Sequence, residues 1–193
     1  MNKVTIVGSL NVDTTLRIKR MPLPGETLAA EGKSSAAGGK GANQAVSAAR
    51  SGAQTAFIGE VGKDNSGQMM LDEMKANGID VAGIRENDQV GTGTASILLD
   101  ENGQNSILIY GGANQQLSPT DVEAAKDKIT AADFVVAQFE TPQAATLRAF
   151  QLAKANGVTT ILNPAPAQKI DPEVLKLTDL IIPNETESAE LTG

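Results

Sequence analysis

The 193-residue sequence contains no histidine, no cysteine and no tryptophan. Without histidine, the chain cannot form a Ser-His-Asp triad, use imidazole as a general acid or base, or build the common zinc sites. Without cysteine it forms no disulfide and no thiolate metal site. This composition fits a reducing compartment, and we expect a cytoplasmic protein. Any acid–base chemistry therefore falls to carboxylates, lysines or the single tyrosine, Tyr110.

Long apolar runs and basic clusters are also absent. No stretch has the length and hydrophobicity of a signal peptide or a membrane span, so we expect no membrane partner. The net charge is −7, and no basic block could neutralise a phosphate backbone, so we expect no nucleic-acid partner. The 40% hydrophobic and 20% charged residues are typical of a globular domain. A small molecule is the expected ligand.

Apolar runs of strand length alternate with helical patterns along the chain. The predicted strands cover 4–9, 55–60, 133–139, 158–163 and 179–183. The predicted helices cover 42–49, 64–78, 117–129 and 141–157. Ser118 and Thr141 precede prolines, which is typical of a capping residue before the first helical position. This alternation predicts one Rossmann-like, doubly wound α/β domain with a mostly parallel sheet over residues 1–193.

Two stretches interrupt this alternation. Residues 14–20 alternate in polarity, and residues 94–110 form two alternating runs joined through Asn102-Gly103, a strong hairpin signal. We interpret them as a small β-sheet with strands within about 14–34 and 92–110, able to cover a ligand as a lid. An edge hairpin without a binding role is the alternative.

The end of the sequence also breaks the alternation. A helix begins after Asn184, and the sequence stops at Gly193 before another strand follows. The last predicted strand would then keep an uncovered edge or face. We therefore expect a fold truncated on its carboxyl-terminal side.

Glycines surround a lysine in "GGKGANQAV", residues 38–46, just before a predicted helix. Such a loop usually binds phosphate through backbone N–H groups and the helix dipole. The stretch nevertheless fails the P-loop pattern, because Ser34 stands at the first glycine position and Gly41 replaces the Ser or Thr after lysine. "GTGTAS" (91–96) similarly fails the dinucleotide pattern, since Ser96 stands at the third glycine position.

Polar residues are expected to gather near this loop. Asn11 and Asp13 follow the first predicted strand two residues apart, so their side chains point the same way. Asn43 begins the helix after Lys40, and Glu140 follows the third predicted apolar run, at a carboxyl end where α/β ligands bind. Carboxylates repel phosphate but accept strong hydrogen bonds from hydroxyls, so this set favours a polyol. The alternative is that these residues only complete a turn and cap a helix.

"PNETE", residues 183–187, has two possible roles. Asn184 and Glu187 are three residues apart, which is close to a capping box and needs no ligand. Alternatively, they lie on the nucleotide side of a site, where Glu187 holds water on a magnesium ion. "NPAPA" (163–167) directly follows a predicted strand and predicts a rigid turn that could also form a pocket wall.

Taken together, these motifs resemble the ribokinase (PfkB) family of ATP-dependent carbohydrate kinases. The resemblance covers essentially the whole chain and depends on motifs in the expected order: "GSLNVD" (8–13), "PGET" (24–27), "GGKGANQAV" (38–46), "GGAN" (111–114), "NPAPA" (163–167) and "PNETE" (183–187). It implies a Rossmann-like domain with a β-sheet lid and a homodimer formed through the lid. It also implies transfer of the γ-phosphoryl group of ATP to the 5-hydroxyl of D-ribose, with Mg²⁺, and with K⁺ as activator.

By the same resemblance, six positions are expected to bind the sugar and two to face the nucleotide. The sugar set is Asn11, Asp13, Gly39, Lys40, Asn43 and Glu140. The nucleotide set is Asn184 and Glu187, with Glu187 near Mg²⁺ through water.

The sequence departs from the family in one respect. The "GAGD" motif, which supplies the anion hole and catalytic base in the family, does not occur, so the resemblance assigns no catalytic residue here. We therefore expect the 193-residue chain to be inactive alone. A non-catalytic sugar-binding or dimerisation module, or a kinase for another sugar or nucleoside, is the alternative. A nicotinamide-dependent dehydrogenase is disfavoured, since "GSLNVD" provides no glycine fingerprint.

Overall fold

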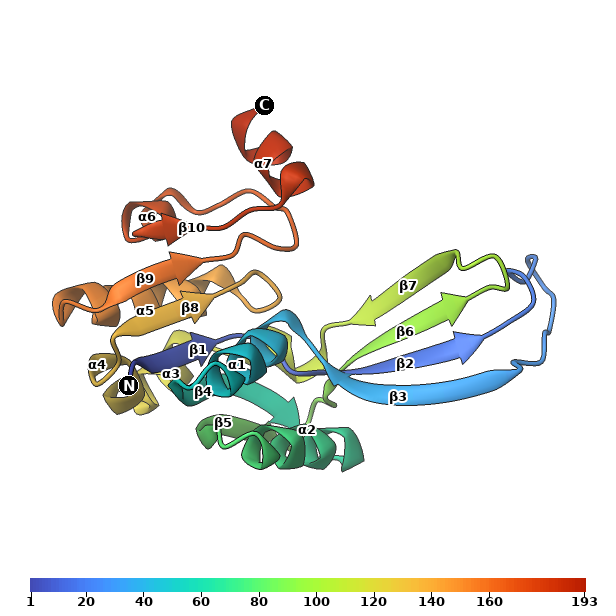
Figure 1. Cartoon of the computed structure of the whole chain (residues 1–193), viewed down its shortest axis with the longest axis horizontal. Coiled ribbons are helices and arrows are strands. Elements are labelled where there is room, and N and C mark those ends of the chain that lie inside the picture. Colours follow the sequence, from blue (N-terminus) through green and yellow to red (C-terminus); the bar gives the residue numbers. More distant parts are fainter.

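The computed structural model describes all residues, 1–193, and contains two β-sheets (Figure 1). The larger sheet is entirely parallel, with strand order β10-β9-β8-β1-β4-β5. Its strands are β1 Lys3–Val7, β4 Gln54–Gly62, β5 Asp80–Asn87, β8 Phe134–Ala137, β9 Thr159–Leu162 and β10 Leu180–Ile181. The predicted doubly wound α/β fold is confirmed.

Helices cover both faces of the large sheet. Two lie on one face: α1 Lys40–Arg50 and α2 Asn65–Ala76. Four lie on the other: α3 Pro119–Ala124, α4 Lys126–Thr130, α5 Gln143–Ala155 and α6 Pro172–Lys176. The last helix, α7 Glu185–Thr192, follows β10. The chain's helices are all too short or too polar to cross a membrane.

Alternate residues of the strands point into two separate apolar clusters. Ile6 and Phe57 pack against α1 and α2, whereas Val7, Ile58 and Val135 pack against the helices of the opposite face. This two-sided burial explains why these strands appear in the sequence as continuous apolar runs.

The last strand has an exposed edge. β10 pairs only with β9, and 51% of Leu180 and 57% of Ile182 are accessible to solvent. The expectation of an uncovered last strand therefore agrees with the geometry.

A second, four-stranded sheet projects away from the large one (Figure 1). Its order is β3-β2-β6-β7, and its strands are β2 Asn11–Arg17, β3 Gly32–Gly38, β6 Gly93–Leu99 and β7 Asn105–Tyr110. The separate small sheet was predicted, but its first strand begins three residues before position 14, and β3 extends to 38, beyond the predicted limit of 34. The covering role of this sheet stays a prediction.

Three local predictions differ from the structure. Strand β5 was not predicted, because as an edge strand it carries Asp, Arg, Glu and Asn among its apolar residues. The predicted helix over 117–129 is two short helices, α3 and α4, separated at Ala125. Thr141 does not cap α5. Pro142 occupies the capping position, and the buried Thr141 hydroxyl has no partner.

Candidate functional site

A hollow of about 350 Å³ lies where the carboxyl end of β8 meets the small sheet. Its walls come from β2, α1, β7, the short 3-10 helix η1 Gly112–Gln116 and the turns after β8 and β9. The lining residues are Asn11, Lys40, Ile109, Gly111, Asn114, Gln115, Phe139, Glu140 and Pro166. This position, at the carboxyl ends of parallel strands, is where ligands of open α/β sheets bind.

The first amide groups of α1 are all used within the protein. The Lys40 N–H donates to Glu140 Oε2 (2.8 Å), the Gly41 N–H to Ser9 Oγ (3.3 Å), and the Ala42 N–H to the Ser9 carbonyl (3.0 Å). The Ser9 hydroxyl donates to the same Glu140 oxygen (2.5 Å). Free amides at a helix start attract phosphate. Here the Glu140 carboxylate takes that place, so the glycine loop is not an open phosphate site.

Two glycines allow α1 to begin this close to β1. Gly39 precedes the helix with φ 94°, a conformation that side chains other than glycine's rarely tolerate. A Cβ on Gly41 would lie 2.6 Å from Ser9 N and 2.9 Å from Gly8 Cα. The glycines of the loop therefore serve close backbone packing, which brings Lys40 and Glu140 together.

Asn11 is oriented by a second amide, Asn114 from η1. Asn114 Oδ1 accepts from the Leu10 N–H (2.9 Å), and its Nδ2 donates to the Leu10 carbonyl (3.1 Å) and to Asn11 Oδ1 (2.7 Å). Only 1% of Asn114 and 5% of Asn11 is exposed. A Cβ on Gly93 would overlap both amide groups. The Asn11 amide nitrogen thus remains available to donate to a ligand in the pocket.

Asp13 provides a carboxylate without a partner in the protein. It lies two residues after Asn11 on β2 and so shares its face of the small sheet. Burial, reinforced by the negative charge of Glu140, raises the pKa of Asp13. In the strand register Asp13 pairs with Ala95 and Ala95 pairs with Ile109, which lines the pocket. Two carboxylates therefore face the region around Lys40.

The structure does not bring all six expected sugar-binding residues to one pocket. Asn11, Lys40 and Glu140 line it, and Asp13 and Gly39 adjoin it through the contacts above. Asn43 does not. Its side chain is exposed and lines a separate hollow between α1 and α2 that includes Glu73 and Met74. Sugar binding by Asn43 therefore has no support from this geometry.

Three residues that hold Glu140 and Asn11 in place were not identified from the sequence. Ser9 and Gln115 hold Glu140 in place: Ser9 bonds the carboxylate and Gln115 Nε2 donates to the Glu140 carbonyl (2.8 Å). Asn114 holds Asn11. The motif "GGAN" includes Asn114, but no pattern in the sequence indicated that Asn114 bonds Asn11.

Asn184 and Glu187 form the predicted capping box of α7. The Glu187 N–H donates to Asn184 Oδ1 (2.8 Å), and the Asn184 N–H donates to Glu187 Oε2 (2.9 Å). The other Glu187 oxygen accepts no hydrogen bond within the protein, and no group of three acidic residues that could hold a metal ion exists in the chain. A single free carboxylate oxygen fits contact with a hydrated Mg²⁺ better than direct coordination.

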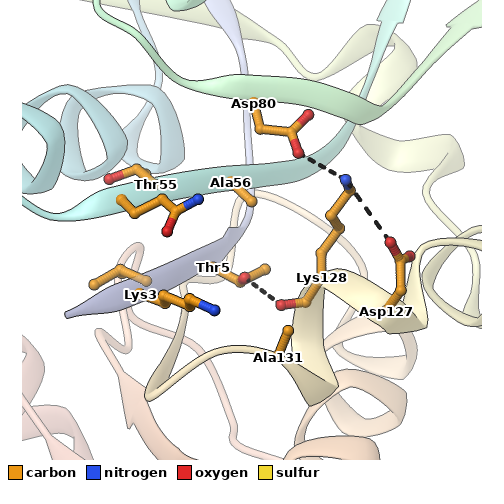
Figure 2. A pocket seen from close by; sticks show the side chains of 10 residues that line it. Lys3, Thr5, Thr55, Ala56, Asp80, Asp127, Lys128 and Ala131 are labelled. Carbon is orange, nitrogen blue, oxygen red and sulfur yellow. Dashed lines mark hydrogen bonds and ion pairs between the residues drawn. The ribbon is translucent and has the colours of Figure 1, made fainter. Parts of the chain in front are cut away.

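A different hollow of about 210 Å³ lies at the amino ends of β1, β4 and β5 (Figure 2). Lys128 and the two aspartates of this hollow are mutually paired, whereas the exposed Lys3 forms no ion pair. The Lys128 ammonium lies 2.6 Å from Asp80 and 3.8 Å from Asp127, and the Thr5 hydroxyl donates to the Lys128 carbonyl (2.8 Å). Because both carboxylates are paired with Lys128 and the site lies at the opposite edge of the sheet, we assign it no ligand.

Comparisons with known proteins identify the family of the chain. The model of the pfkB family of carbohydrate kinases matches residues 1–193. The chain is 50% identical to a ribokinase of Staphylococcus aureus, covering 100% of this chain and 64% of that protein. It is 52% identical to a bifunctional ribokinase/ribose-5-phosphate isomerase A of Fructilactobacillus sanfranciscensis, of which it covers 36%.

A solved ribokinase structure has the same fold as this chain. The ribokinase of Arabidopsis thaliana, complexed with ribose and ATP, superimposes with a TM-score of 0.93 at 34% identity, covering 100% of this chain and 63% of that one. The chain thus spans less than two thirds of the length of these relatives. The chain belongs to the pfkB family of carbohydrate kinases.

Proposed function

We propose that this chain supplies the sugar-binding part of a ribokinase, which transfers the γ-phosphoryl group of ATP to the 5-hydroxyl of D-ribose. The observation that carries the proposal is the pair of carboxylates, Asp13 and Glu140, beside Lys40 in a pocket whose helix start is closed to anions. Resemblance to ribokinases over the whole chain supports the choice of sugar.

Each polar group of the pocket has a defined part in holding a sugar. The unpartnered Asp13 carboxylate and Glu140 Oε1 accept hydrogen bonds from hydroxyls, and the Asn11 amide donates one. The Lys40 backbone N–H holds Glu140 Oε2, and the Lys40 side chain lines the pocket. Phe139 and neighbouring apolar groups exclude water from the carbon face of the sugar. Phosphoryl transfer depends on positioning, and this set would fix the acceptor hydroxyl.

The nucleotide side is proposed at Asn184 and Glu187, at the start of α7. Bound Mg²⁺ would neutralise charge on the ATP phosphates, and Glu187 would hold one of its waters. Activation by K⁺ and a cytoplasmic location stay predictions. These residues contain no GAGD motif, so the isolated chain should bind sugar without turnover. A coupled ATPase assay with ribose that gave normal ribokinase turnover would contradict this.

A homodimer through the small sheet is part of the proposal. Strand β7 is a free edge, and its four apolar residues are each at least half exposed, at Ile107 50%, Leu108 70%, Ile109 66% and Tyr110 55%. Exposed apolar strands at an edge favour association. Burial of β7 against a second copy would also help to close the pocket, since Ile109 lines it.

Isothermal titration calorimetry tests the sugar assignment directly. The chain should bind D-ribose, and inorganic phosphate at the same concentration should bind far more weakly. Asp13→Ala should lose about 1.5–3 kcal/mol of binding free energy, the value of hydrogen bonds to a charged group. Wild-type affinity for ribose in this variant, or preferential binding of phosphate, fructose or adenosine, would count against the proposal.

A further inference from the structure

Three side-chain amides form a continuous hydrogen-bonded chain across the carboxyl ends of β8, β9 and β10. Gln138 Nε2 donates to Gln44 Oε1 (2.6 Å), and Gln44 Nε2 donates to Asn163 Oδ1 (3.2 Å). Asn163 Nδ2 then donates to the Ile182 carbonyl (2.8 Å). We call Gln138, Gln44 and Asn163 the amide chain.

The two ends of the amide chain adjoin different parts of the proposed site. At one end, Gln138 precedes Glu140 by two residues, and Gln44 lies one helical turn after Lys40 on α1. At the other end, Ile182 precedes Asn184 by two residues. The amide chain therefore joins the sugar pocket to the turn that starts α7.

Stability alone does not explain amides at these positions. Gln138 is fully buried, its Oε1 has no hydrogen-bond partner, and a Cβ on Gly8 would overlap that oxygen. Burying an unpaired polar atom costs free energy that an apolar side chain of similar size would avoid. The neighbouring buried residues of β8, Val135 and Ala137, are apolar.

The direction of the hydrogen bonds is uniform. Every amide in the chain donates toward β10, and Gln44 and Asn163 each accept from the β8 side. Turning the Gln44 amide over would place its NH₂ against the Gln138 NH₂ and its oxygen against the Asn163 oxygen. One orientation of each side chain is therefore fixed by the others, which sets the spacing of α1 and three strand ends.

We propose that Gln44 is a positioning residue that couples the sugar pocket to the segment 180–187. Ligand bound between Lys40 and Glu140 restrains the start of α1 and the end of β8. The amide chain passes that restraint to the Ile182 carbonyl and so to the start of α7. This inference rests on the proposed sugar site and adds to it a link to the nucleotide side.

Hydrogen exchange of the 180–187 amides, with and without saturating D-ribose, tests the coupling. In the wild-type chain, ribose should slow exchange in this segment by roughly threefold or more. Gln44→Leu breaks both links, and Gln44→Glu keeps the acceptor for Gln138 but loses the donor to Asn163. Both variants should lose the ribose-dependent slowing. Gln68→Leu, the same change at an exposed helical position on α2, should keep it.

A purely structural role of Gln44 would change the baseline exchange but leave the ribose-dependent difference in place. Persistence of that difference in Gln44→Leu, or in Gln44→Glu if the leucine variant does not fold, overturns the inference. Calorimetry on the same samples separates the two claims. If the wild-type chain binds ribose without any change in 180–187, only the coupling fails. If it binds no ribose, the proposed function fails as well.

Discussion

The substitution Gly38→Ala isolates the contribution of Asp13 without touching its charge. Gly38 ends β3 and pairs with Asn11 on β2. A Cβ at position 38 would overlap the carboxyl group of Asp13, since its three nearest atoms are Oδ2, Cγ and Oδ1 of that residue. The backbone of Gly38 does not have a positive φ, so alanine fits the local conformation. The Asp13 side chain must therefore move.

The expected effects on stability and binding differ in size. The Asp13 carboxylate has no hydrogen bond to lose, and replacing glycine by alanine restricts the unfolded chain, so the free energy of unfolding should change by less than about 1 kcal/mol. Displacing the carboxylate from the sugar should remove about 1.5–3 kcal/mol of binding free energy. That loss corresponds to an affinity roughly 10- to 150-fold weaker.

Calorimetric titration with D-ribose and urea denaturation measure the two quantities. Gly32→Ala is the matched control on the same strand, because its Cβ would lie 3.6 Å from Arg17 Cδ, an ordinary contact. The control should bind ribose as the wild type does. Unchanged ribose affinity in Gly38→Ala would show that Asp13 does not contact the sugar. The double variant Gly38→Ala/Asp13→Ala should bind ribose no more weakly than Asp13→Ala alone, because no carboxyl group is left for the new Cβ to displace.

Three further predictions concern stability and assembly. Burial, then repulsion from Glu140, raises the pKa of Asp13, so its contribution to stability is present at low pH and lost as pH rises through the raised value. Asp13→Asn should therefore raise the melting temperature at pH 7 and weaken ribose binding. The gain in melting temperature should fade below about pH 4, where Asp13 is also neutral in the unfolded chain. A lower melting temperature of the variant at pH 7 would contradict this prediction. Asn114→Ala leaves both backbone groups of Leu10 without their partner and should cost about 2–4 kcal/mol in urea denaturation; a cost under about 1 kcal/mol would show that the contacts are dispensable. Leu108→Glu should give monomers in sedimentation velocity where the wild type gives dimers, and a dimeric variant would place the interface elsewhere.

Much of the large sheet could be predicted from the sequence, because strands buried on both faces are apolar at nearly every position. Strands β8, β9 and β10 lie within predicted segments, and β1 and β4 overlap theirs but extend one to two residues beyond them. The helix cap at the start of α7 was also predictable, because both of its hydrogen bonds join residues close in sequence. Asn184 and Glu187 bond each other across a spacing of three residues.

The small sheet was harder to delimit. Strand β3 has four exposed residues of seven and no apolar alternation, so only its pairing with β2 defines it. Asn11 and Asp13 were expected to follow β1 directly, yet they lie on β2 in the second sheet. Their shared orientation was nevertheless predictable, because it depends only on their spacing of two residues.

The pocket was predictable in its chemistry but not in its connections. Carboxylates and amides near Lys40 indicated a polyol, whereas the residues that hold them act across long sequence separations. Ser9 bonds Glu140 131 positions away, and Asn114 bonds Leu10 104 positions away. No local pattern specifies such pairs. Asn43, expected in the same set, lines a separate hollow with residues of α2.

A crystal structure of the chain with D-ribose bound would show whether the two carboxylates hold the sugar. Hydroxyl oxygens of the sugar should lie within hydrogen-bond distance of Asp13 and of Glu140 Oε1, with Glu140 Oε2 still held by Ser9 and the Lys40 N–H. Sugar bound elsewhere, or bound in this pocket with either carboxylate turned away from it, would refute the proposed sugar site.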